Sequence, residues 1–164
     1  MYKGCEIVDI SIPDLSYHHA AHAMTFCTEI ASITRRYLET EAEISGDMFV
    51  SMAMLTDAVY GSDYVQANRI RTKFMNITAR LFENIDVIAT PTQRSGATKM
   101  HKDDHLYGRM DGKEVQGHSE FLKLANFVGI PAITIPLGFD QNDMPIGFHL
   151  MAKWVKYLLL IFQL

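Results

Sequence analysis

Two histidines near the amino terminus have a spacing that could bind a metal ion. His18 and His22 lie four residues apart in a segment with helical periodicity, so both imidazoles could face one ion. Zinc would need a third protein ligand, and a hydrolytic site would also need a general base such as the Glu of a HExxH motif. Neither lies beside this pair, although His101 and His105 could supply distant ligands. We interpret the histidines as partly buried or surface residues and predict no metal and no other cofactor, with the metal site as the weaker alternative.

Candidate nucleophiles are also poorly placed. Ser95 and Gly96 follow Thr90-Pro91-Thr92 and lead into a polar loop, which differs from the strand-turn-helix setting of a nucleophile elbow. Cys27 lies in the middle of a predicted helix on an apolar face, where low polarity raises the pKa of a thiol and keeps it inert. The glycines lack the spacing of a phosphate-binding loop. We therefore assign no catalytic residue within this chain.

Composition places the chain among globular, non-nucleic-acid-binding proteins. Of its 164 residues 48% are apolar and 21% charged, and the formal charge of −4 comes without a basic cluster, so no nucleic-acid partner is expected.

Cys5 and Cys27 lack CxxC spacing, which favours buried thiols in a reducing compartment over a disulfide. No secretory signal is visible, so an intracellular location is favoured. The apolar residues 154–164 are too few to cross a bilayer, so no transmembrane segment is predicted.

The first half of the chain predicts one strand and two helices. Residues 5–12 alternate loosely before Pro13 and predict a short strand. A long helix follows from about Leu15, and Gly61 is expected to close a second, shorter helix in a left-handed conformation, with Ser62 capping the next one. The apolar stripe of the long helix is His19, Ala23, Phe26, Ile30, Ile33 and Tyr37, and that of the shorter helix is Met48, Met52, Leu55 and Val59.

The second half predicts a helix, three strands and a long loop. The stripe of the helix after Ser62 is Ala67, Ile70, Phe74, Ile77, Leu81 and Ile85, whereas Arg69, Arg71, Lys73 and Arg80 lie outside it. A strand over 86–90 ends at Pro91, and residues 93–117 form a loop. A helix from Ser119 to Gly129 leads to strands over 132–137 and 146–151, joined by a turn. The fold class is α/β, with helices packed on an incomplete mixed sheet.

Six short motifs follow one another along nearly the whole chain: 25–32 (TFCTEIAS), 36–37 (RY), 64–71 (YVQANRIR), 86–92 (DVIATPT), 126–138 (NFVGIPAITIPLG) and 145–151 (PIGFHLM). In this order they resemble amidase-signature hydrolases. Each match alone is weak, but together they are specific. The approach through residues 12–22 and the strand over 86–92 are most similar to fatty acid amide hydrolases.

The resemblance implies a partial amidase-signature fold without its catalytic segment. The family hydrolyses linear amide bonds with a nucleophilic Ser, a bridging Ser in a cis peptide and a Lys base, all in segments that these 164 residues do not contain. The chain is therefore expected to be inactive alone, and a small-molecule amide substrate is expected only in a full-length enzyme. Thr90, Pro91 and Thr92 are the expected substrate-binding residues, with a simple strand exit as the equal alternative.

Departures from the family pattern lie near the carboxyl end. His149 and Ala152 stand where the family often has Gln and Gly, and the apolar tail after Trp154 replaces a charged helix. We expect residues 1–153 to be the carboxy-terminal portion of an amidase-signature domain and 154–164 a divergent tail, with Met1 an internal methionine of a longer enzyme. An exposed sheet edge is expected to favour self-association. The alternative is a non-catalytic binding or regulatory module derived from the same fold.

Overall fold

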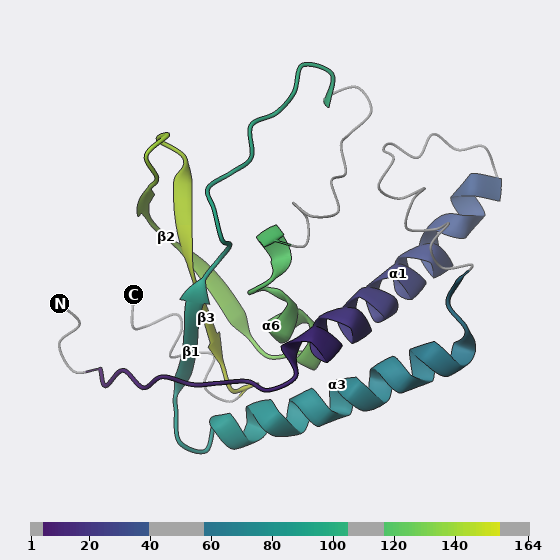
Figure 1. Cartoon of the computed structure of the whole chain (residues 1–164), viewed down its shortest axis with the longest axis horizontal. Helices are drawn as coiled ribbons and strands as arrows, with labels where there is room; N and C mark the ends of the chain where they lie inside the picture. Colours follow the sequence, from purple (N-terminus) through teal and green to yellow (C-terminus); the bar gives the residue numbers. More distant parts are fainter. Residues whose placement is uncertain (1–4, 40–57, 105–116, 155–164) are drawn as a thin grey trace.

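The computed structural model describes residues 5–39, 58–104 and 117–154, apart from the side chains of residues 34–39. In Figure 1 the two long helices run in opposite directions along one another, and the short α6 lies between α1 and the sheet. This arrangement confirms the predicted α/β class, with helices packed on an incomplete sheet. The helices and strands are α1 (Leu15–Glu39), α3 (Gly61–Leu81), β1 (Val87–Pro91), α6 (Lys123–Val128), β2 (Ala132–Phe139) and β3 (Pro145–Ala152).

The described sheet has three strands in the order β1-β3-β2, and both pairs are antiparallel. The parallel pairing that a mixed sheet would include is not seen among the described strands. The predicted hairpin between β2 and β3 is confirmed. Its turn is fixed by Asp140, whose carboxylate accepts hydrogen bonds from the backbone N–H groups of Asn142 at 2.8 Å and Met144 at 3.0 Å. Both β1 and β2 lie at edges of the described sheet, so their outer backbone groups have no strand partner there.

Helix α3 packs with the face that its periodicity predicts. Ala67 and Phe74 are buried, and Ile70, Ile77, Leu81 and Ile85 pack around the core. Phe74 is fully buried, which contributes roughly 1.5–3 kcal/mol by transfer of its ring from water. The main core joins α3 and α6 to β1 and β3, and its buried members are Phe74, Phe82, Ile88, Leu124, Ala125, Val128 and Met151.

Helix α1 forms as predicted but packs with a different face. Its buried residues include His18, Ala21 and Thr25, whereas Phe26 is 42% and Ile33 58% exposed. The predicted stripe starts one residue later than this face, which corresponds to a rotation of about 100° around the helix. The packed face includes the polar residues His18 and Thr25, which a search for apolar periodicity does not count. Thr25 satisfies its hydroxyl within the helix by donating to the carbonyl of Ala21 at 2.9 Å.

Two other local predictions are wrong. The strand predicted over residues 5–12 does not form, since these residues pair with no strand among the described residues. An apolar alternation forms a strand only where a partner strand is present. Ile7 in this segment is 84% exposed. Gly61 is the first residue of α3 rather than the left-handed end of another helix. The amino end of α3 is capped by Asp63, whose carboxylate accepts from the Tyr60 N–H at 3.0 Å, and not by Ser62. The helix predicted through Met48 falls largely outside the described residues.

The carboxyl end of α6 has the predicted termination. Gly129 is left-handed, with φ of 77°, and its N–H donates to the Ala125 carbonyl at 2.9 Å. Arg71 also stabilises this end of α6, because its Nε donates to the carbonyl oxygen of Phe127 at 2.6 Å. Although Arg71 lies outside the predicted apolar stripe, it is partly buried and links α3 to α6. In the described part of the chain, no helix is long and apolar enough to span a membrane.

We expect Arg71→Met to destabilise the fold by about 1–3 kcal/mol, because the Phe127 carbonyl would lose its charged donor at a helix end. Urea denaturation followed by circular dichroism measures the change. Arg69→Met is the matched control, since Arg69 is exposed on the same helix and is expected to change stability by less than about 0.5 kcal/mol. Equal stabilities of the two variants would contradict the linking role of Arg71.

Candidate functional site

The predicted substrate-binding residues lie at the carboxyl end of β1, where three strands bring polar side chains into one row. Thr90 is the register partner of His149 on β3, and Thr134 on β2 is the partner of the same histidine. Directly paired residues of antiparallel strands project from the same face of a sheet. Thr90, His149 and Thr134 therefore lie side by side across the sheet. The row was not foreseen from the sequence, because it depends on the register between distant strands.

Thr92 extends this row beyond the end of β1. Its backbone N–H donates to the carbonyl of Gly147 at 3.0 Å, and its hydroxyl donates to the hydroxyl of Thr134 at 3.5 Å. The two threonines close over Gly147, where an added Cβ would lie 2.5 Å from Thr92 Oγ1 and 2.8 Å from Thr134 Cγ2. We call the set of Thr90, Thr92, Thr134, Gly147 and His149 the threonine ledge. A glycine is needed at its centre because any side chain would displace a hydroxyl.

The residues of the ledge differ in burial, with the buried His149 at the centre of the row, on β3. His149 is 4% exposed, and burial lowers the pKa of its imidazole below the usual value, so the ring is neutral at neutral pH. Its Nδ1 and the buried Thr90 Oγ1 have no hydrogen-bond partner among the described residues. Thr134, on the edge strand β2, is exposed. The ledge can therefore donate and accept hydrogen bonds to a neutral polar ligand without presenting a charge.

The three predicted residues do not all face the same way. Thr90 and Thr92 belong to the ledge, whereas Pro91 pairs with Phe148 and lies on the opposite face. That face is apolar, since its cross-strand rows include Ala89 with Leu150 and Ile133. No described hydrogen bond joins Thr90 Oγ1 to a base, so the hydroxyl is not activated as a nucleophile. The arrangement supports binding, and the substrate-binding role of residues 90–92 stays a prediction.

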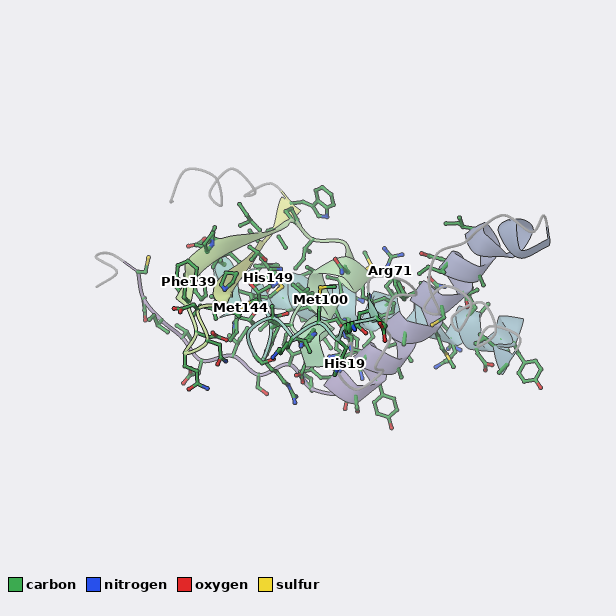
Figure 2. The ribbon with its side chains drawn as sticks, turned by 90° about the horizontal axis from the view of Figure 1, so that it is seen from above. His19, Arg71, Met100, Phe139, Met144 and His149 are labelled. Carbon is green, nitrogen blue, oxygen red and sulfur yellow. The ribbon has the colours of Figure 1, made fainter. Side chains whose placement is uncertain are left out.

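The histidines of α1 pack against aromatic rings. His18 is fully buried, with ring centroids 4.8 Å from Phe74 and 5.1 Å from Phe127. His22 stacks on His18 at 6.5 Å. Among the residues that the structure describes, no group of three His, Cys, Asp or Glu side chains could hold a metal ion, and His105 lies outside them. Figure 2 shows that His149, on the sheet, is well separated from His19 at the start of α1.

The two cysteines differ in their surroundings. Both are free, but Cys5 is exposed, so the predicted burial of this thiol is wrong. It lies in the extended segment 5–12, which lacks the predicted strand partner. Cys27 is partly buried on α1, and burial raises the pKa of its thiol as expected. Neither cysteine belongs to the threonine ledge.

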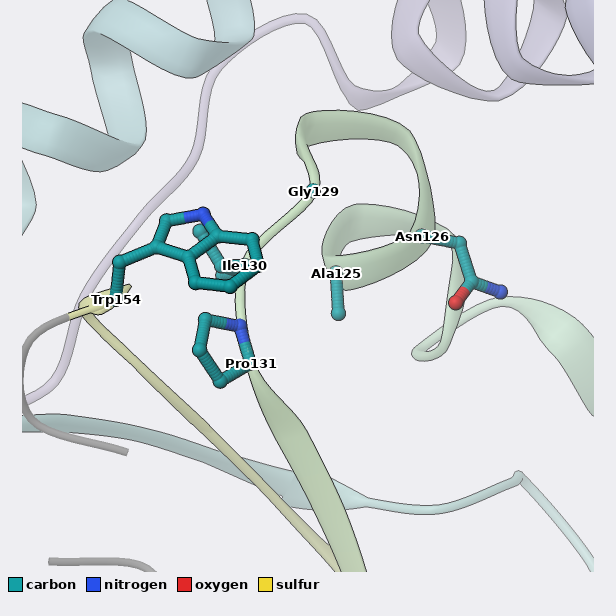
Figure 3. Close-up of a pocket in the computed structure, with 6 residues that line it drawn as sticks. All are labelled: Ala125, Asn126, Gly129, Ile130, Pro131 and Trp154. Carbon is teal, nitrogen blue, oxygen red and sulfur yellow. The ribbon is translucent and has the colours of Figure 1, made fainter. Parts of the chain in front are cut away.

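A shallow apolar groove lies at the other end of β3, beside the carboxyl end of α6 (Figure 3). Its volume is about 490 Å³, and the indole of Trp154 forms one wall while remaining 66% exposed. None of the described residues that line it is titratable, so binding to these residues would depend on apolar contact. The lining residues are Ala125, Asn126, Gly129, Ile130, Pro131 and Trp154.

Solved structures of an amidase and of a cyclic dimer hydrolase share this fold. The chain superposes on a crystal structure of amidase with a TM-score of 0.78 and 17% identity, over 93% of this chain and 35% of that one. It also superposes on 6-aminohexanoate cyclic dimer hydrolase complexed with substrate, with a TM-score of 0.67 and 21% identity, over 94% of this chain and 35% of that one. The fold is therefore a part of the amidase-signature fold, as the sequence resemblance implied.

The chain belongs to the amidase family, because the family model described as Amidase matches residues 2–156. It is 30% identical over 156 residues to the fatty acid amide hydrolase of Arabidopsis thaliana, covering 93% of this chain and 26% of that protein. It is 28% identical over 174 residues to a glutamyl-tRNA(Gln) amidotransferase subunit of Halothermothrix orenii, covering 91% of this chain and 35% of that protein. The chain thus spans about a quarter to a third of the length of these relatives.

We expect Gly147→Ala to destabilise the fold by about 1–3 kcal/mol, because the new methyl group would overlap Thr92 Oγ1 and Thr134 Cγ2. Thermal denaturation measures the loss. Gly61→Ala is the control: nothing lies within 4 Å of its added Cβ at the start of α3, so this change is expected to be neutral or stabilising. If Gly147→Ala melts like the unsubstituted protein, the two threonines do not close over this glycine.

Proposed function

We propose that this chain is the carboxy-terminal portion of an amide hydrolase that cleaves linear carbon–nitrogen amide bonds. One observation carries the proposal: the amidase family model matches residues 2–156, while the chain spans 26% of the Arabidopsis thaliana relative. The portion supplies the three-stranded sheet, the helices on one face and one wall of the substrate pocket. The nucleophilic serine, the bridging serine and the lysine base belong to other segments of the complete enzyme.

In this proposal the threonine ledge binds the substrate amide. Thr90 and Thr92 present hydroxyl groups that can donate to a carbonyl oxygen or accept from an amide N–H. The neutral His149 adds a polar atom without a charge, which suits an uncharged amide better than a carboxylate. Pro91 is the last residue of β1 and shapes the rim of the proposed substrate pocket. The substrate is a lipid-type amide, which the similarity to fatty acid amide hydrolases supports.

The division of the chain is part of the same proposal. Residues 1–153 form the amidase portion and 154–164 a divergent apolar tail. The isolated portion self-associates through the open edge of its sheet, where Leu137 is 56% and Phe139 72% exposed on β2.

The purified 164-residue chain is expected to show no labelling by a fluorophosphonate probe above background and no hydrolysis of fatty acid amides. The reason is that Ser95, which precedes a glycine, lies in an exposed loop without a described base. In-gel fluorescence of the labelled protein is the measurement. A full-length fatty acid amide hydrolase serves as the positive control.

Ser95→Ala separates specific from incidental labelling. The variant and the unsubstituted chain are expected to give the same background signal. Stoichiometric labelling that Ser95→Ala abolishes, or amide turnover by the unsubstituted chain, would show that these residues carry their own nucleophile and would overturn the proposal.

A further inference from the structure

The amino-terminal part of α1 is attached to the rest of the molecule through imidazoles. His18 is fully buried, and its ring meets Phe74 of α3 and Phe127 of α6 edge-on, at centroid distances of 4.8 and 5.1 Å. His22, one turn later, meets Phe127 at 5.8 Å and stacks on Phe26 at 6.0 Å. We call these two histidines and the rings of Phe74 and Phe127 the histidine junction. It is the place where α1, α3 and α6 meet.

No group within the described residues compensates a charge on His18. Both of its ring nitrogens are buried without a hydrogen-bond partner. Burial, followed by the positive charges that His19, His22 and Lys123 can carry, lowers the pKa of His18 to about 4. Burial and the same lysine also lower the pKa of His22. The histidine junction is therefore stable only while its imidazoles are neutral.

The charged groups on the surrounding elements do not change this conclusion. On α3, Arg71 is positive and bonds to the Phe127 carbonyl, and Lys73 forms an ion pair with Asp14, at the start of α1, at 2.7 Å. Before α6, the carboxylate of Glu120 is held by Arg94. Both carboxylates thus have their own cations.

Fewer and smaller apolar side chains hold α1 in place than hold α3 and α6 on the sheet. The buried apolar residues that hold this end of the helix are Ala21, Ala67 and Phe127, two of which are small. The core that joins α3 and α6 to the sheet instead contains Phe74, Phe82, Leu124 and Met151 among others. Because less apolar area is buried at α1, its release needs less free energy than unfolding of the sheet.

We propose that the histidine junction is a proton-operated latch, in which neutral His18 and His22 hold α1 on α3 and α6 and their protonation in mildly acidic solution releases α1. Released imidazoles reach water and regain their ordinary proton affinity, whereas the closed junction excludes the proton. Acid therefore shifts the equilibrium toward the open form. The release uncovers Phe127 and the adjoining face of α6 while the sheet stays folded.

The direction of the pH dependence follows from linkage. A histidine whose pKa is lower in the closed state stabilises that state fully above its ordinary pKa of 6.5 and loses this contribution as the pH falls toward 4. Between pH 6.5 and about pH 5, His18 alone should raise the opening equilibrium constant by roughly fifteenfold, and His22 adds to the effect. The hydrogen bond from Arg94 lowers the pKa of the Glu120 carboxylate, which moves its titration away from this range.

Hydrogen–deuterium exchange with mass spectrometry tests the latch on the full chain at pH 6.5 and about pH 5, after correction for the intrinsic exchange rate at each pH. The expected result is at least about tenfold faster corrected exchange in peptides from residues 15–31, with a change of less than about threefold in β2 and β3. His18→Phe and the smaller His18→Leu should both remove most of the difference. His101→Gln, which alters an exposed histidine, should retain it.

Three results would overturn the proposal. One is unchanged corrected exchange of residues 15–31 between the two pH values. Another is an equal acid-induced loss of protection in α1 and the sheet, which would indicate global unfolding instead of local release. The third is an acid response of undiminished size in a folded His18→Phe or His18→Leu variant.

Discussion

A three-stranded sheet is stable in water only if at least one of its faces is covered, and here the cover is supplied by α3 and α6. Phe74 of α3 is fully buried against the main core, which also contains Ile88 of β1 and Met151 of β3. Arg71 ties α3 to the end of α6 through the Phe127 carbonyl. The register of the strands depends on this covered face, and the threonine ledge depends on the register.

The remainder of the sheet is less completely covered. β1 and β2 are edges among the described strands, and Ala89, on the face opposite the ledge, is exposed. A complete domain would be expected to pair such edges and cover such faces. This geometry agrees with the coverage of relatives, because the chain matches the amidase family along nearly its whole length but spans a quarter to a third of those proteins.

The ledge and the histidine junction use buried polar groups in different ways. In the ledge, the unpaired Thr90 hydroxyl and His149 nitrogen lie in the same row as the exposed Thr134, so a ligand bound to this row could satisfy them. In the junction, the nitrogens of His18 are enclosed by aromatic rings, so that only protonation and movement of α1 can satisfy them. The first arrangement suits recognition of a neutral ligand, and the second couples a helix to pH.

Sequence alone predicted the elements whose signals are local. Gly129 and the following Pro131 identified the end of α6, and the apolar stripe through Phe74 identified the packed face of α3, because each signal lies within one element. The packed face of α1 was missed since it includes a buried histidine, His18, which apolar periodicity does not count. The ledge was found only in part, because the pairing of Thr90 with His149 joins strands that are distant in the chain.

The central claim is that this chain holds an incomplete sheet with open edges, and sedimentation velocity over a wide range of protein concentration tests it most directly. We predict a sedimentation coefficient that increases with concentration. Substitution of the exposed β2 residues, Leu137→Lys together with Phe139→Lys, should abolish the increase without unfolding the chain, because charged side chains block edge pairing. A monomer at every concentration, with the same melting temperature in both proteins, would contradict the claim.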